Sequence, residues 1–217
     1  MTPSEMRILH ADARSVVVDK PAGLLSVPGR GDAKADCVAA RVRTAFPDAS
    51  GPLIVHRLDM DTSGLMILGL DPAAQRFLSA QFERRRVEKV YTALVAGDVQ
   101  QDQGLIDLPL RPDWPNRPRQ IVADNGRASR TRYRVASREI DRTRLRIYPE
   151  TGRTHQIRVH VADPRGLGHP ILGDPLYSQA EQPGCDPVSR LMLHASTLGI
   201  RLPGTRRLRT FESQPPF

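Results

Sequence analysis

The stretch HRLDMDTSG, residues 56–64, places a carboxylate, Asp59, between two apolar residues and then turns at once on Asp-Thr-Ser-Gly. Apolar runs flank it, with Leu-Ile-Val at 53–55 and Leu-Met-Ile-Leu at 65–68. Short apolar runs bounded by turn residues are typical of buried strands. The sequence therefore predicts strands over 52–58 and 64–70. The acid between them serves either to form the turn or to take part in a reaction.

The composition fits a globular protein of one domain over residues 1–217. The chain is 39% hydrophobic and 26% charged, which are ordinary values. No apolar run is long enough to cross a bilayer, and residues 1–21 lack the basic and apolar regions of a signal peptide. We therefore expect a cytoplasmic protein, and we predict a monomer.

Neither the cysteines nor the histidines suggest a metal site. Cys37 and Cys185 lie far apart and outside any CxxC or Cys/His cluster, so we expect reduced thiols. His155 and His160 are five residues apart, a spacing that would not direct both side chains of a helix at one metal. We predict no metal and no cofactor.

The charge balance indicates a nucleic-acid partner. The net charge is +8, and among the 32 basic residues only Lys20, Lys34 and Lys89 are lysines, which leaves 29 arginines. Guanidinium groups bind phosphate in bidentate fashion and stack on bases. A genome biased toward arginine would explain the choice of Arg over Lys, but it would not create the positive net charge. We therefore expect RNA or DNA as the ligand.

The remaining pattern predicts a mixed α+β fold. A helix is expected over 36–46, and a second begins at Asp71, a good N-cap followed by Pro72, with an apolar face of Ala74, Phe77, Leu78 and Phe82. Residues 108–122 hold four prolines and are expected to form a long exposed loop. Further strands are expected over the ranges 16–19, 89–97, 129–139, 142–150, 191–202 and 208–213.

Residues 151–163 fit two local structures. Ile157, Val159 and Val161 alternate with polar residues as in a strand, whereas Thr154 as N-cap with Ile157 and Val161 four apart fits a short helix. The residues alone leave both open.

Four blocks of the chain resemble the RluA family of pseudouridine synthases. HRLDMDTSG resembles the family signature HRLDxxTSG. The others follow the family's order: DKPAGLLSVPG (19–29), EKVYTALVAG (88–97), and TGRTHQIRVHVADPRGLGHPILGDPLY (151–177) followed by LMLHA (191–195). The resemblance runs from about residue 16 to about residue 200. The loop LPLRPDWPNRPRQ is similar to that of the branch that modifies both a tRNA anticodon-loop uridine and a 23S rRNA hairpin.

The resemblance implies the pseudouridine synthase catalytic fold: a mixed, mainly antiparallel sheet in two halves, with helices packed around a central RNA-binding cleft. It also implies a helix over 154–162. The blocks begin almost at once, so we expect no N-terminal S4-type RNA-binding module.

Three residues are implied to be catalytic. Asp59 matches the family's catalytic aspartate, which acts close to C1′, C2′ and C6 of the nucleotide; whether it attacks C1′, adds to C6 or removes the C2′ proton stays open. Arg153, in TGRTH, matches its basic partner, and a nearby guanidinium lowers the pKa of a carboxyl group and keeps it ionised. Tyr91, in KVYTAL, matches the tyrosine whose ring stacks on the flipped uracil and whose hydroxyl lies near the departing C5 proton.

Other residues are implied to bind RNA. Arg57 matches the arginine that fills the space left by the flipped base, His56 is expected to brace the same loop, and Leu193 resembles the apolar contact under the uracil. Thr62 lies within the signature itself. The basic cluster Arg84, Arg85 and Arg86, with the arginine-rich strands over 130–146, is the expected surface for the RNA backbone.

Two alternatives come from other classes of protein. A noncatalytic RNA-binding protein or chaperone could use the same scaffold, although Asp59, Tyr91 and Arg153 are all present. A metal-dependent nuclease could use Asp59 with Asp61, although no third carboxylate or metal-spaced histidine accompanies them.

Overall fold

The computed structural model describes residues 5–178 and 190–217, so Cys185 lies outside the described residues. The chain forms two compact units, Met1–Lys89 with His194–Pro216, and Val90–Leu193 with Phe217. Within the described ranges, no helix is both long and apolar enough to span a membrane.

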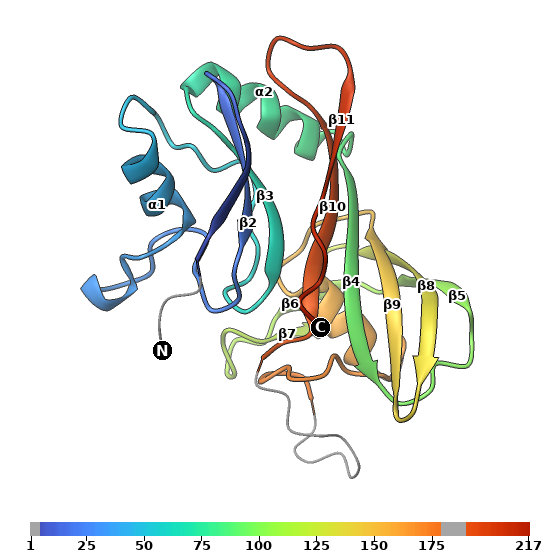
Figure 1. The fold of residues 1–217 in the computed structure, drawn as a ribbon. Helices are drawn as coiled ribbons and strands as arrows, with labels where there is room; N and C mark the ends of the chain where they lie inside the picture. The colour runs from blue at the N-terminus through green and yellow to red at the C-terminus, as the bar shows by residue number, and fades with distance from the viewer. Residues whose placement is uncertain (1–4, 179–189) are drawn as a thin grey trace. The chain divides into compact units, whose positions relative to one another are not determined.

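The first unit contains a mixed sheet (Figure 1). The strand order is β1-β2-β3-β10, and β11 pairs with β10. β10 runs parallel to β3, and the other pairs are antiparallel. The elements are β1 (Arg7–Ala11), β2 (Ser15–Lys20), η1 (Asp32–Lys34), α1 (Val38–Ala45), β3 (Ser63–Gly69), α2 (Pro72–Glu83), β10 (Leu193–Arg201) and β11 (Leu208–Glu212).

Strand β3 is the centre of this unit. All seven of its residues are buried, because β2 and β10 pair along its two edges and α2 packs on it. The core cluster joins these elements through Val17, Leu65, Ile67, Leu78, Val87, Leu198, Ile200, Leu202 and Phe211. The predicted buried strand after the DMDTS turn is confirmed.

Helix α2 begins as predicted, but its buried face differs from the prediction. The Asp71 carboxylate accepts hydrogen bonds from the N–H groups of Ala73 and Ala74. Phe77, expected to be buried, is 41% exposed. Gln81 is buried instead, because its amide exchanges two hydrogen bonds with the backbone of Arg201.

The strand expected over residues 52–58 is wrong. Leu53 is fully buried with a left-handed backbone, φ 58°, and the segment keeps only an isolated bridge between Ile54 and Leu68. A strand ladder requires extended φ at every residue. The apolar run is therefore buried as irregular chain that leads into the DMDTS turn.

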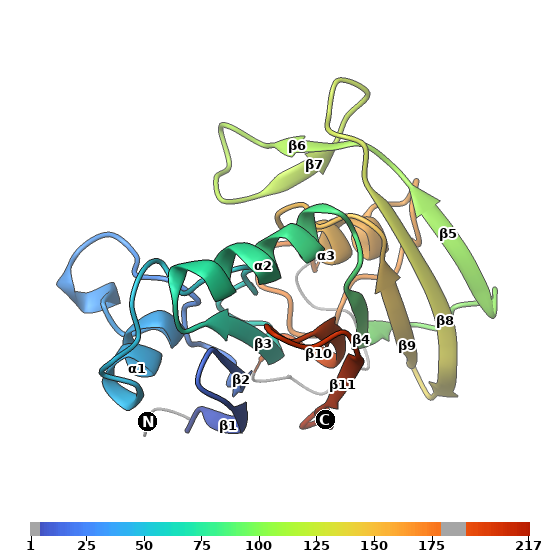
Figure 2. The same cartoon turned by 90° about the horizontal axis from the view of Figure 1, so that it is seen from above.

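The second unit contains an antiparallel sheet of order β4-β9-β8-β5 and a separate hairpin, β6-β7 (Figure 2). Helix α3 packs against β7 and β8. The elements are β4 (Glu88–Ala96), β5 (Gln103–Asp107), β6 (Leu110–Pro112), β7 (Gln120–Val122), β8 (Arg130–Glu139), β9 (Arg142–Pro149) and α3 (Gln156–Ala162).

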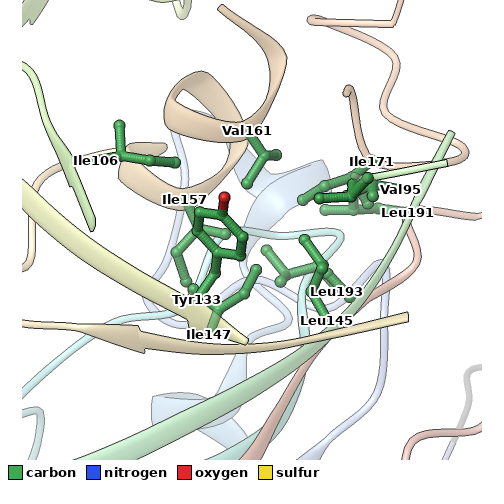
Figure 3. Close-up of a cluster of buried hydrophobic side chains, with 12 residues drawn as sticks. Val95, Ile106, Tyr133, Leu145, Ile147, Ile157, Val161, Ile171, Leu191 and Leu193 are labelled. Carbon is green, nitrogen blue, oxygen red and sulfur yellow. The ribbon is translucent and has the colours of Figure 1, made fainter. Parts of the chain in front are cut away.

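The core of this unit lies between the sheet and α3 (Figure 3). Tyr133 of β8 with Leu145 and Ile147 of β9 faces Ile157 and Val161 of α3. The alternation predicted for β8 and β9 is confirmed, because Tyr133, Leu145 and Ile147 are buried while the arginines between buried positions are partly or fully exposed. The predicted α+β class, with mainly antiparallel pairing, is confirmed as well.

Two predictions in this unit need correction. Residues 108–122 were expected to form a loop without regular structure, but the hairpin β6-β7 closes both ends of it. The helix expected over residues 154–162 is present but begins at Gln156; its N-cap is His155, with φ 53° and no side-chain hydrogen bond, so Thr154 is not the cap.

Candidate active site

Asp59 opens a tight turn whose backbone is held on both sides. The N–H of Thr62 donates to the Asp59 carbonyl at 3.2 Å, which closes a turn over residues 59–62. Just before it, the N–H of Leu58 donates to Ser26 Oγ at 3.1 Å, and the Ser26 hydroxyl donates to the Leu58 carbonyl at 2.7 Å. Asp59 itself is partly buried. These bonds fix the backbone that carries the carboxylate.

A fully buried lysine ties the middle of this turn to the end of β2. Lys20 Nζ donates to the carbonyl oxygens of Pro21, Leu24 and Met60 at 2.9, 2.7 and 2.8 Å. The N–H of Gly23 also donates to the Met60 carbonyl, at 2.9 Å. A buried ammonium group is tolerated only where such acceptors surround it. The DKPAG block thus secures the turn next to Asp59.

The residue after the turn begins a chain of buried hydrogen bonds. Ser63 Oγ lies 2.8 Å from His194 Nδ1, and His194 Nε2 lies 3.1 Å from Ser213 Oγ. The Ser213 hydroxyl donates to the Asp19 carboxylate at 2.7 Å, and Arg7 pairs with the same oxygen. Because the single hydroxyl proton of Ser213 is used on Asp19, His194 Nε2 carries a proton.

Gly64 has no room for a side chain. Its φ is 112°, and a Cβ atom would lie 2.4 Å from the carbonyl oxygen of Ala195. The glycine of the DMDTSG sequence therefore permits β10 to approach β3 directly beside the turn.

His56 braces the start of the stretch. Its ring stacks on Phe82 with centroids 4.4 Å apart, and its Nε2 accepts a hydrogen bond from the N–H of Ile67. Burial, with a smaller effect of the Lys89 charge, lowers the pKa of His56 to about 3, so its ring is neutral at pH 7. Arg57, the next residue, is exposed.

Thr62 is 2% exposed. Thr62 therefore lies inside the turn and not on the surface. Its burial does not support the expected contact of its side chain with RNA.

The basic cluster of residues 84–86 follows α2 in a Schellman motif. Arg85 has φ 55°, its N–H donates to Phe82 O at 3.1 Å, and the N–H of Arg86 donates to Gln81 O at 2.9 Å. The three arginines are exposed, and none forms an ion pair with a described residue. An arginine in this conformation is strained, since glycine is the usual residue there.

In the second unit, Arg153 lies on a loop that Gln156 organises. The Gln156 amide oxygen accepts from the Thr151 hydroxyl at 2.7 Å and from the Arg153 N–H at 3.0 Å. Its NH2 group donates to the carbonyl oxygen of Arg130 and to Thr131 Oγ1, both at 2.9 Å. The buried amide thus joins the loop to β8, while the Arg153 side chain stays exposed.

Tyr91 and Leu193 contact the same apolar cluster. Tyr91 lies on β4 opposite Ile147 of β9 and packs, partly buried, against the core of this unit. Leu193 is a member of that core and is 3% exposed. Within this unit the structure therefore brings together two of the residues expected to contact uracil.

The arginine-rich strands carry less free positive charge than their sequence suggests. Ion pairs to Asp or Glu involve Arg130, Arg132, Arg138, Arg142 and Arg144. Arg134 and Arg146, opposite each other in the ladder, form no ion pair with a described residue. Most arginines of this face are paired with carboxylates. The cluster of residues 84–86 is therefore a better candidate than this face for binding phosphate.

Two further histidines form hydrogen bonds within the second unit. His160 is buried between Thr131 Oγ1 and the Leu108 carbonyl, and burial lowers its pKa. His155 Nδ1 lies 2.7 Å from the Tyr177 hydroxyl. In the described parts of the chain, no group of three or more His, Cys, Asp or Glu side chains could hold a metal. Cys37, a free and buried cysteine, caps α1.

Sequence analysis does not single out Gln156 or a buried ion pair next to it. The Arg158 guanidinium binds both carboxylate oxygens of Asp174, at 2.8 and 2.7 Å, and both side chains are at most 3% exposed. The available signal is a charged residue, Arg158, between the apolar residues Ile157 and Val159, which fits either the strand or the helix considered for residues 151–163. The pair fixes α3 to the following turn.

Comparison with protein families gives a match that covers most of the chain. The family described as RNA pseudouridylate synthase matches residues 14–163. A protein of Yersinia pestis, dual-specificity RNA pseudouridine synthase RluA, is 48% identical over 200 residues, covering 91% of this chain and 93% of that protein. The protein of the same name from Escherichia coli K12 is 44% identical over 212 residues, covering 97% and 93%.

Two solved human structures have a similar fold. RNA pseudouridylate synthase domain containing 1 aligns with a TM-score of 0.77 and 27% identity, over 100% of this chain and 86% of that one. RNA pseudouridylate synthase domain containing 4 aligns with a TM-score of 0.75 and 27% identity, over 96% and 88%.

Proposed function

Since this chain belongs to the RluA family of RNA pseudouridine synthases, we propose that Asp59 is the carboxylate with which it isomerises uridine in RNA. The enzyme is an isomerase: the bond from C1′ to N1 breaks, a bond from C1′ to C5 forms, the C5 proton leaves and N1 gains a proton. The atoms balance without an oxidant or a co-substrate, so the protein has to supply only positioning and acid–base chemistry.

One observation carries the assignment of Asp59. The carboxylate stands at the first position of a turn whose neighbours are held by Ser26, Lys20 and Ser63 through buried hydrogen bonds. A group that must approach a single nucleotide atom gains rate from such fixed placement. A residue that only formed an Asx-turn would need none of this support.

The other roles follow from the family's blocks. We propose that Tyr91 stacks on the uracil and that its hydroxyl lies near the C5 proton, that Leu193 supports the base, and that Arg153 is the basic partner of Asp59. Arg57, exposed beside the turn, is proposed to fill the space of the flipped base.

The RNA backbone is proposed to bind at the exposed cluster of residues 84–86. His56 and Thr62 are assigned to holding the turn, because His56 is stacked and hydrogen-bonded and Thr62 is buried.

RNA is the substrate, and the choice of RNA is a proposal. The relatives from Yersinia pestis and Escherichia coli are named as dual-specificity enzymes. With the resemblance of the 108–120 loop, this supports a tRNA anticodon-loop uridine and a 23S rRNA hairpin uridine as the two targets. We further propose a single catalytic domain over residues 1–217, a monomer that acts in the cytoplasm without metal or cofactor.

The test is an in vitro reaction with unmodified tRNA and 23S rRNA fragments in the presence of EDTA. Pseudouridine is mapped by carbodiimide-dependent primer extension, with Asp59→Asn and the matched variant Asp61→Asn alongside. We expect stops on both RNAs that disappear in Asp59→Asn and persist in Asp61→Asn. Asp59→Asn should still bind RNA.

Other outcomes separate the alternatives. A stop on rRNA alone would remove the tRNA target. RNA bound without any stop would favour the chaperone. Strand cleavage that appears only in a parallel reaction with Mg²⁺ and without EDTA, and that both variants lose, would identify a nuclease.

A further inference from the structure

The β6-β7 hairpin of the second unit carries an exposed tryptophan. Trp114, the single tryptophan of the chain, is 62% exposed. Arg117 lies over its ring, with the guanidinium carbon 4.2 Å from the centroid. A large aromatic side chain left in water costs hydrophobic free energy, and tryptophan and arginine are the residue types enriched at binding sites. The pair therefore needs an explanation that the core does not provide.

The loop that presents this pair is closed by its own hydrogen bonds. The N–H of Asp113 donates to Arg119 O at 3.0 Å, and the N–H of Asn116 donates to Asp113 O at 3.1 Å. The N–H of Arg119 donates to Asn116 O at 3.0 Å. The Asn116 side chain also donates to the Asp113 carboxylate. Residues 113–119 thus form a preorganised loop, which reduces the entropy lost when a ligand binds.

The hairpin is anchored to the body of its unit. The N–H of Gln120 donates to the Tyr177 hydroxyl at 2.8 Å. Leu110 and Val122 pack on Val159 of α3. Figure 2 shows β6 and β7 as a hairpin of their own, outside the β4-β9-β8-β5 sheet. The tip can therefore hold a ligand in a fixed place relative to α3.

The charge of the loop fits a polyanion. Arg111, Arg117 and Arg119 form no ion pair with a described residue, in contrast to the arginines of β8 and β9. Arg119 lies 5.5 Å from the Tyr177 ring centroid. The one carboxylate of the loop, Asp113, is occupied by Asn116. Guanidinium groups near an aromatic face suit a nucleotide, which offers a base to stack and a phosphate to pair.

We propose that Trp114 and Arg117 form a second nucleotide site, which stacks an unpaired base of the RNA other than the uridine being isomerised. The site rests on the proposed function, since its ligand is the substrate RNA. Its role is to add affinity and to select RNAs with an unstacked base at the required distance from the reacting uridine. Unpaired bases and phosphate groups occur in the loops of both tRNA and rRNA, so the proposed site serves both substrates.

Tryptophan fluorescence tests the site directly, because the chain has no other tryptophan. An unmodified RNA hairpin is titrated into wild type and into Asp59→Asn, and binding is followed in parallel by filter retention. We expect the Trp114 emission to be quenched along the binding curve in both proteins. In steady-state assays, Trp114→Ala should raise KM between about fivefold and about 150-fold with kcat little changed. Trp114→Phe, which keeps an aromatic ring for stacking, should raise KM less than Trp114→Ala does.

The matched control is Ile140→Ala. Ile140 is 90% exposed in the same unit but lies at the β8-β9 turn, and its truncation should leave KM unchanged. Circular dichroism confirms the fold of each variant. Arg117→Lys, which keeps the charge but loses the planar group, should lie between wild type and Trp114→Ala in KM.

Each other result overturns the inference. Pseudouridine formed while Trp114 emission stays constant would leave the function intact and remove this site. A concentration-dependent dimer that Trp114→Ala abolishes, with RNA affinity unchanged, would make the tip a protein interface. Absence of both RNA binding and pseudouridine would overturn the function and the site together.

Discussion

Ser63 Oγ lies 2.8 Å from Nδ1 of His194, which joins the end of the HRLDMDTSG stretch to β10. With Nε2 protonated and directed at Ser213, the His194 ring bridges the Ser63 and Ser213 hydroxyl groups. The imidazole therefore links the strand that follows Asp59 to β10 and to the β10-β11 pair.

His194→Ala should lower kcat with KM little changed. Removing the ring leaves two buried hydroxyl groups without this partner, at a cost of about 1–3 kcal/mol in the free energy of unfolding. A small displacement of the turn should reduce kcat roughly tenfold to a hundredfold. Steady-state kinetics and urea unfolding measure the two effects. His194→Gln, which can donate and accept, should recover part of kcat; a kcat equal to that of wild type in both variants would contradict the link.

Lys20→Met should lower the free energy of unfolding more than the same substitution at an exposed lysine does. The variant keeps the length of the side chain but removes the ammonium donor from the carbonyl oxygens of Pro21, Leu24 and Met60, of which Met60 keeps the N–H of Gly23. We expect a loss of about 2–5 kcal/mol in the free energy of unfolding, with a loss of activity because the turn is released. The control is Lys34→Met at an exposed site, which should change little. Comparable effects of the two substitutions would remove Lys20 from the support of the turn.

The sequence predicts secondary structure correctly where the signal is local, such as an alternating pattern or a helix N-cap. The N-cap at Asp71 and the alternation of β8 and β9 were predicted and are observed. The strand over 52–58 failed because an apolar run signals burial, which Leu53 satisfies in a left-handed conformation that no periodicity reveals. The predicted burial of Phe77 is wrong for a related reason, since the helix buries Gln81 through a partner 120 residues away.

Much the same division applies to the candidate site. Motif resemblance singled out Asp59, Tyr91 and Arg153, because their types and spacings are local. What holds them was not predictable, because Ser63 with His194 and Gln156 with Thr131 are contacts between residues far apart in sequence. The ion pairing of the arginine-rich strands is likewise a property of the assembled sheet.

Acid should destabilise the fold through His56. Its pKa is about 3 in the folded protein against 6.5 ordinarily, so protons bind the unfolded chain more readily. The stabilisation is complete above about pH 6.5 and is lost as the pH falls toward 3. Burial lowers the pKa of His160 in the same direction. The carboxylates with lowered pKa, such as Asp71, stabilise the fold above about pH 4 and lose that stabilisation only below it.

Urea unfolding between pH 7 and pH 4 measures this term. His56→Gln, which retains a hydrogen-bond acceptor for Ile67, should be less stable at pH 7 but should show a shallower decline toward pH 4. A slope unchanged by His56→Gln would mean that folding does not lower the pKa of His56.

Tyr91→Phe should separate stacking from proton transfer. The ring keeps its packing against the core cluster beside Ile147, so RNA binding and fold should persist. Loss of the hydroxyl should slow release of the C5 proton, which we expect to lower kcat by about a hundredfold or more. Tritium release from RNA carrying 5-tritiated uridine measures the step. A wild-type rate in Tyr91→Phe would exclude the hydroxyl from the reaction.

Arg85→Gly should make the fold more stable and RNA binding weaker. Arg85 occupies the C′ position of a Schellman motif with φ 55°, where glycine avoids a strain of about 1–2 kcal/mol. The same substitution removes one phosphate-binding charge, so the slope of log affinity against log salt should fall by roughly 0.7–0.9. Urea unfolding and binding at several salt concentrations measure both. Arg84→Gly is the matched control: it removes an equal charge at a residue with φ −82°, so the salt slope should fall equally while stability drops. Stability gained by Arg85→Gly with an unchanged salt slope would show that this strained arginine does not serve RNA binding.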